Sequence, residues 1–148
     1  MSVTQSTNTL RDWVASKVAT ISSVKTFKFG YPYDINAVMR SNNYPLFLMV
    51  PPDYQRDNYT PNSNSPNRRI YDLDFWLYDN VLQSEYEDIE ETYGALETKM
   101  FACIDAIFSE LTLLSPAKNL QVIFYPDVGN DKVRAMQVMI KGYFNLCY

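Results

Sequence analysis

Residues 70–78 read IYDLDFWLY, and this stretch decides which fold the sequence can adopt. Its side chains alternate between two sets, which is the pattern of a β-strand with one face in a core. The core face carries Tyr71, Leu73, Phe75 and Leu77, and the second face carries Asp72, Asp74, Trp76 and Tyr78. The second face is half acidic and half aromatic, so it is expected either to be wet or to be covered by a neighbour.

The second face leaves two questions open. A buried second layer and a contact with another subunit explain Trp76 and Tyr78 equally well. Asp72 and Asp74 lie roughly 7 Å apart on one strand face, and such a pair can hold a divalent cation or serve in acid–base chemistry. Solvated acids are the simpler interpretation, because no third carboxylate or Asn ligand follows at a recognisable spacing. We expect no metal site, no cofactor and no catalytic residue.

A long helix is expected after this strand. Ser84 and Glu87 have the spacing of a capping box, and Pro116 is expected to end the helix. One apolar stripe runs between them at alternating steps of three and four: Ile89, Tyr93, Leu96, Met100, Ile104, Ile107, Leu111 and Leu114. At about 1.5 Å per residue, this helix of about 30 residues would approach 45 Å. Cys103 lies beside the stripe and is predicted to be an inert core thiol.

The segment before the strand is polar and has no apolar pattern. Residues 51–69, PPDYQRDNYTPNSNSPNRR, contain four prolines, four asparagines and no aliphatic residue. Long loops without structure of their own are usually functional or disordered. We predict a long polar loop here, and we expect contacts with other subunits or partners from Tyr54, Arg56, Tyr59, Arg68 and Arg69, together with Trp76 and Tyr78 in the strand.

The other elements complete an α+β order. Residues 1–8 are predicted to be a flexible tail, and Thr9 is expected to cap a first helix that ends near residues 22–23. Strands are predicted over residues 24–29, 44–50, 120–125 and 133–148, with a turn over 126–131. The order indicates a single domain, 1–148, with a mostly antiparallel sheet packed on one face by a short N-terminal helix and the long central helix.

Composition excludes several classes of function. The chain contains no histidine, which removes the commonest general base and metal ligand. The net charge is −4 and no basic cluster exceeds Arg68 and Arg69, so tight binding of nucleic acid is not expected. The apolar run over residues 46–50 is too short to cross a bilayer, and no secretion signal is expected at the N-terminus.

Several short patterns, taken in order, resemble the tail-terminator or tail-completion (neck) proteins of tailed bacteriophages, most of all those of crAss-like phages. After the N-terminal helix come YPLFLMVPP (44–52), a polar loop, YDLDFWLYD (71–79), CIDAIFSEL (103–111), FYPDVGND (124–131) and a last strand ending NLCY (145–148). The resemblance covers roughly residues 9–148. The resemblance rests on the order and spacing of these patterns rather than on any one of them.

The resemblance implies a structural virion protein made in the host bacterial cytoplasm. Such proteins are small α+β subunits without catalytic residues, and they form rings between the portal and the tail. It implies a homo-oligomer, a hexamer or a dodecamer, that binds neighbouring portal or connector and tail proteins. DNA would pass through its channel without tight binding. A non-viral protein–protein adaptor of a contractile or secretion apparatus is the alternative, and a metal enzyme built on Asp72 and Asp74 is a third.

Overall fold

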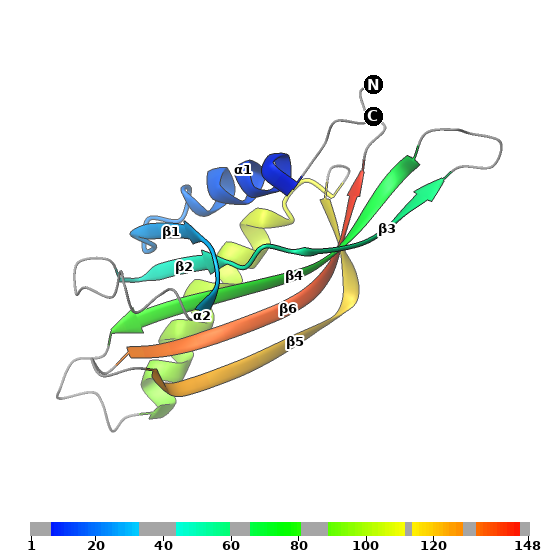
Figure 1. The fold of residues 1–148 in the computed structure, drawn as a ribbon. Coiled ribbons are helices and arrows are strands. Elements are labelled where there is room, and N and C mark those ends of the chain that lie inside the picture. The colour runs from blue at the N-terminus through cyan, green and yellow to red at the C-terminus, as the bar shows by residue number, and fades with distance from the viewer. Residues whose placement is uncertain are drawn as a thin grey trace.

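The computed structural model describes residues 7–32, 44–59, 66–80, 89–111, 114–128 and 133–145. They form two helices and six strands in the order α1 (Thr7–Val18), β1 (Thr26–Phe29), β2 (Leu46–Met49), β3 (Asp53–Tyr59), β4 (Pro66–Asn80), α2 (Ile89–Ile107), β5 (Leu114–Val128) and β6 (Val133–Asn145). The predicted α+β class is confirmed: a mostly antiparallel sheet carries a short N-terminal helix and a longer central helix (Figure 1).

Strand β4 organises the sheet. Along one edge it pairs with β6 over Arg68–Asn145 to Asn80–Val133. Along the other edge it pairs first with β3, over residues 66–72, and then with β2, over residues 75–78. The strand order is β1-β2-β4-β6-β5, with β3 paired to β4 beside that path. Only the β1–β2 pair is parallel among the described strands.

The alternation read from residues 70–78 is confirmed in the core. One face of the sheet packs against both helices (Figure 1), and it carries all four predicted core residues of β4. The Phe75 ring lies 5.5 Å from the Phe47 ring of β2 and is fully buried. From α1 come Leu10, Val14 and Val18, and from α2 come Leu96, Met100, Cys103, Ile104 and Ile107. Apolar burial on this face is therefore the main stabilising contribution to the fold.

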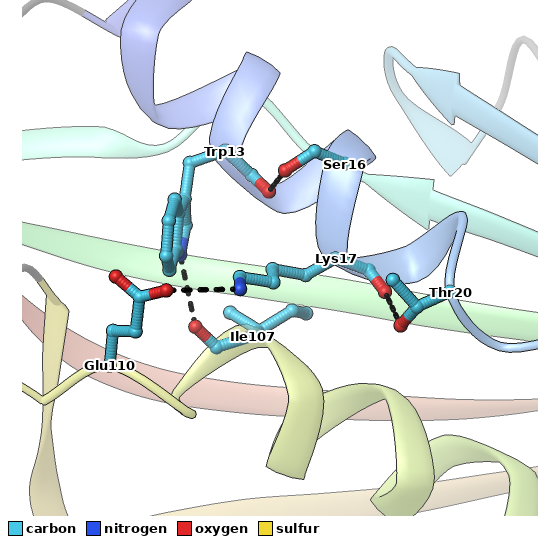
Figure 2. Close-up of polar contacts among 6 residues, drawn as sticks. All are labelled: Trp13, Ser16, Lys17, Thr20, Ile107 and Glu110. Atoms are coloured by element: carbon cyan, nitrogen blue, oxygen red, sulfur yellow. Dashed lines mark hydrogen bonds and ion pairs between the residues drawn. The ribbon is translucent and has the colours of Figure 1, made fainter.

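The two helices are held together where α2 ends (Figure 2). The indole N–H of Trp13 donates to the carbonyl of Ile107 at 3.0 Å. That carbonyl is one of the last four of α2, which have no partner inside the helix. The ammonium of Lys17 lies 4.4 Å from the Trp13 ring centroid and 3.4 Å from the carboxylate of Glu110. Trp13 thus satisfies one carbonyl at the C-terminus of α2 and links the two helices there.

The central helix is shorter than the sequence predicts. It ends at Ile107, and the next strand begins at Leu114, so the prediction that it runs to Pro116 is wrong. Leu114 is buried as the first residue of β5, while Leu111 is 57% exposed. The apolar spacing continues past the helix end because a turn places the next strand's first residue on the same core. The predicted cap, Ser84 and Glu87, lies outside the described residues.

Other boundaries also differ. Helix α1 begins at Thr7, so Thr9 does not cap it and positions 7 and 8 are not part of a tail. Residues 6–9 are Ser, Thr, Asn and Thr, so the sequence offers several equivalent capping residues around the start of the helix. The helix ends at Val18 rather than near 22–23, because Thr20 and Ile21 close tighter turns with carbonyls three residues back. Strand β5 is longer than the predicted 120–125, since pairing with β6 extends it at both ends.

The predicted loop over residues 51–69 is largely strand. Residues 53–59 form β3, and β4 already begins at Pro66. The two strands pair from Asp53–Asp72 to Tyr59–Pro66, with register shifts after Tyr54 and after Asn58. We call the paired residues 54–59 of β3 and 66–69 of β4 the arm. In Figure 1 the arm projects from the end of the sheet, past both helices. Pairing with β4 holds β3 in place.

Candidate functional site

The face of the sheet opposite the helices, here the far face, carries an aromatic cluster. Trp76 stacks between Tyr78, at 5.8 Å between ring centroids, and Tyr125 of β5, at 4.8 Å. The cluster includes Tyr44, Leu46, Leu48, Tyr78, Val133 and Ala135, with Val50, Trp76 and Tyr125 at its border. Of the two explanations left open for Trp76 and Tyr78, a buried second layer is therefore present within the chain. Tyr78 is only 1% exposed.

A chain of hydrogen bonds leads away from this cluster across three strands. The hydroxyl of Tyr125 in β5 donates to the side-chain oxygen of Gln137 in β6 at 2.9 Å. The amide nitrogen of Gln137 then donates to the carboxylate of Asp74 in β4, also at 2.9 Å. Gln137 is 7% exposed, so both of its polar atoms have the partners that burial requires. The chain fixes the position of the Asp74 carboxylate.

The Asp74 carboxylate of this network is partly shielded from water. Burial raises the pKa of its carboxyl above the usual range, and the Gln137 amide and the nearby Trp76 indole oppose that rise only in part. Its charge also contributes to the raised pKa of Tyr78, whose main cause is burial of the phenol. The negative charge of Asp74 is therefore retained at a cost to stability.

Replacing Asp74 with asparagine is expected to stabilise the protein at neutral pH. Because the folded-state pKa is raised, the contribution of this carboxyl to stability is full below its unfolded pKa and is lost as the pH rises through the folded value. Asp74→Asn keeps an oxygen for Gln137 but cannot ionise. In urea unfolding at about pH 3, the wild type and the variant should have nearly equal midpoints. At about pH 7, the midpoint of the variant should lie above that of the wild type. A lower midpoint for the variant at pH 7 contradicts this account.

Beside the cluster, the far face is hollowed into a groove of about 690 Å³, here the far-face groove. It lies over β4, β6 and β5 and reaches the start of β3. Its walls combine acidic, basic and apolar groups, among them Val50, Asp53, Asp72, Asp74, Met139, Lys141 and Tyr143. The sequence analysis identified Asp72 and Asp74, but it missed the β6 residues. Nothing in the sequence indicates that β6 pairs with β4 in the register that brings Lys141 beside Asp72.

A row of three charges crosses this groove. Asp53 of β3 lies directly opposite Asp72 of β4, which in turn lies opposite Lys141 of β6. The Lys141 ammonium is 3.4 Å from the Asp72 carboxylate, and both side chains are nearly half exposed. A surface ion pair of this kind contributes little, and like charges directly opposite on neighbouring strands are unfavourable. Asp72 therefore has a like charge beside it on β3 and an opposite charge beside it on β6.

The structure places the other predicted interface residues on the arm. Tyr54, Arg56 and Tyr59 are positions in β3, and Arg68 and Arg69 are positions in β4. The guanidinium of Arg68 is exposed and lies 5.3 Å from the centroid of the Tyr143 ring, at the border of the groove. The arm and the groove are thus adjacent surfaces of one molecule. Their role in contacts between molecules stays a prediction.

The described residues give little support for catalysis or metal binding. No three His, Cys, Asp or Glu side chains among them gather closely enough to hold a metal ion. Cys103 is buried, and burial raises the pKa of its thiol to about 12, so the reactive thiolate is disfavoured. No described helix has the length and apolar character needed to span a membrane.

Comparison with known proteins finds similarity only to solved structures, at low sequence identity. No protein-family model and no curated protein matches the sequence. Solved structures do match, among them the gp17 protein of bacteriophage SPP1, at 13% sequence identity and a TM-score of 0.41. The alignment covers 94% of this chain and 89% of that one. A likeness at this level carries no argument about function, so the function has to be argued from the chain's own residues.

Proposed function

We propose that this chain is a structural virion protein of the tail-completion type, as the sequence resemblance implies. In this proposal, copies of the chain assemble into a ring at the head–tail connector. The ring joins portal-side and tail proteins, and DNA passes through its channel. Within this type, the proposal groups the chain with the proteins of crAss-like phages, which its sequence patterns resemble. The chain is not an enzyme in this proposal.

The arm is the observation that carries the proposal. It extends the sheet past both helices, with β3 paired to the first residues of β4 (Figure 1). A segment in this position suits a contact with another subunit. A ring requires one surface of each subunit to match a different surface of the next. The arm supplies one of these surfaces.

The charge of the chain agrees with a DNA channel. The net charge of −4, with no run of basic residues longer than Arg68 and Arg69, does not favour tight binding of phosphates. A channel lining that does not bind DNA lets the duplex move through it. Partners above and below the ring would instead be held by contacts between proteins.

Shortening the arm tests the proposal. Residues 57–69 are replaced by Asn-Gly, which joins the paired positions Arg56 and Ile70 through a two-residue hairpin turn. We expect the wild-type chain to assemble and the shortened chain to be monomeric. Its melting temperature should change by only about 2–4 °C, because all of the core is retained. Light scattering and native mass spectrometry measure the assembly.

The control is Arg11→Ala, a substitution of a partly exposed residue on the helix side, and it should assemble like the wild type. A wild-type chain that stays monomeric over the whole accessible concentration range contradicts the ring. Assembly of the shortened chain at wild-type strength contradicts the role of the arm. Capture of a partner from uninfected bacterial cells would instead favour the adaptor function.

A further inference from the structure

We propose that the outer edge of β5 is a contact surface for a second copy of this chain. Residues 120–125 of the two copies pair there as antiparallel strands around a two-fold axis, so that backbone hydrogen bonds join the two sheets. A two-fold contact uses the same patch on both copies, whereas a ring is closed by two different patches. The inference is therefore separate from the proposed ring.

Strand β5 lies at the edge of the sheet (Figure 1). Among the described strands it pairs with β6 alone, so its outer side presents backbone N–H and C=O groups to a further strand. The pairing with β6 is regular over residues 120–125, and its register shifts on both sides of this stretch. Pro116 and Pro126 lie beyond its two ends. Register shifts and prolines hinder pairing, so the usable part of the edge is the stretch 120–125.

This stretch lacks the features that protect an edge strand. Residues 120–125 read LQVIFY, with no charge, no proline and no glycine. Leu120 is 41% exposed, and Val122 and Phe124 are only partly buried. The opposite edge of the sheet, β1, is four residues long and carries the exposed Lys28. Short strands and lysines discourage pairing at an edge, so β5 is the edge that can accept a partner.

A second copy of the stretch matches this edge. Alternate residues of β5 face opposite sides, since Val122 and Phe124 pack on the helix side and Tyr125 lies in the far-face cluster. Residues directly opposite each other in a sheet share a face. Around a two-fold axis, one residue therefore lies opposite itself. Centring the pair on Val122 sets Leu120 against Phe124, which covers the exposed leucine with an aromatic ring. No two like charges meet in this register.

The contact is small, which determines how it acts. Interfaces that bury less than about 1,000 Å² are typically transient, and a few residues of each copy meet here. The pair is therefore expected to be weak between single chains, and to become strong only when several copies act together in an assembly. A chain with the shortened arm can accordingly still be monomeric in dilute solution.

Disulfide trapping tests the register, because it captures even a transient pair. Gln121 and Ile123 lie opposite each other across the proposed contact. In a Cys147→Ser background, a mixture of Gln121→Cys and Ile123→Cys chains should give a disulfide-linked dimer on a non-reducing gel, and neither variant alone should. Opposite Cα atoms are about 5 Å apart, whereas diagonal ones are about 7–8 Å apart, and a disulfide needs less than about 7 Å. Cys103 is buried and stays in place.

Charge substitutions test the same contact in matched variants. Val122→Cys lies opposite itself and should form a disulfide-linked dimer in the Cys147→Ser background. Adding Gln121→Lys/Ile123→Lys sets like charges opposite each other, and the dimer should be lost. Adding Gln121→Lys/Ile123→Glu at the same two positions sets opposite charges together, and the dimer should return. Circular dichroism should show the same folded spectrum for every variant.

The outcomes separate this contact from the ring. Equal cross-linking of the mixture and of each cysteine variant alone contradicts the register, and so does a dimer that the two lysines leave unchanged. No cross-link in any variant contradicts the contact, and it is also the result expected if a strand of another protein occupies this edge. Light scattering of the wild type judges the ring independently. A monomer there, with cross-linking in the mixture alone, supports the β5 contact and contradicts the ring.

Discussion

Replacing Phe75 with alanine is expected to lower the free energy of unfolding by about 3–5 kcal/mol. Phe75 lies in the middle of β4, is fully buried and packs against Phe47 of β2. Its neighbours in the sheet are Met49 on one side and Val138 on the other. The substitution leaves a cavity where the strand pairing is continuous on both edges, so the surroundings cannot easily close it.

Urea unfolding followed by circular dichroism measures this loss. Domains of this size are typically stable by about 5–15 kcal/mol, so the variant should be marginal. Phe29→Ala is the matched control, because this ring is only partly buried at the edge of the core, and a smaller loss is expected. A loss for Phe75→Ala that is no larger than the loss for Phe29→Ala would show that the core is not centred on β4.

Replacing Arg134 with alanine is expected to cost about 2–4 kcal/mol. Arg134 is 3% exposed, so its charge depends on partners inside the protein. Its Nε donates to the carbonyl of Pro126 in β5 at 3.0 Å, and its Nη1 donates to the hydroxyl of Thr92 in α2. One side chain of β6 therefore joins the neighbouring strand and the first turns of the central helix.

The nearby Lys99 provides the comparison for Arg134. Its ammonium is 2.7 Å from the carboxylate of Asp79, but the pair is partly exposed, and loss of such a pair costs about 1 kcal/mol or less. Lys99→Ala should therefore be much milder than Arg134→Ala. Arg134→Lys should not restore stability, because an ammonium cannot reproduce the fork of the guanidinium. Equal losses for Arg134→Ala and Lys99→Ala in urea unfolding would contradict this account.

The core could be predicted from the sequence because burial leaves a periodic pattern. Alternation over residues 70–78 identified the correct face of β4, and the spacing of Leu96, Met100 and Ile107 identified the core side of α2. Boundaries were harder. The end of α2 was misplaced because Leu111 and Leu114 continue the same spacing, although one is exposed and the other starts a strand.

The arm and the groove could be predicted only in part. Strand β3 has no apolar alternation, since its stability comes from backbone pairing with β4, and that pairing leaves no pattern in the side chains. The prolines and asparagines of residues 51–69 therefore indicated a loop. The groove needs the register of β4 with β6, which the sequence does not contain. Asp72 was identified from its own strand, while its partner Lys141 became visible only in the folded sheet.

The β3–β4 pairing also has a consequence for the strength of assembly. A segment that becomes ordered only on binding loses backbone entropy worth about 1–2 kcal/mol per residue. The seven residues of β3 are already fixed in the single chain, so a neighbouring subunit would not have to supply about 7–14 kcal/mol to order them. Preorganisation of this kind leaves more of the contact energy for affinity. The arm is therefore suited to a tight and durable junction, rather than to the weak and reversible binding typical of disordered tails.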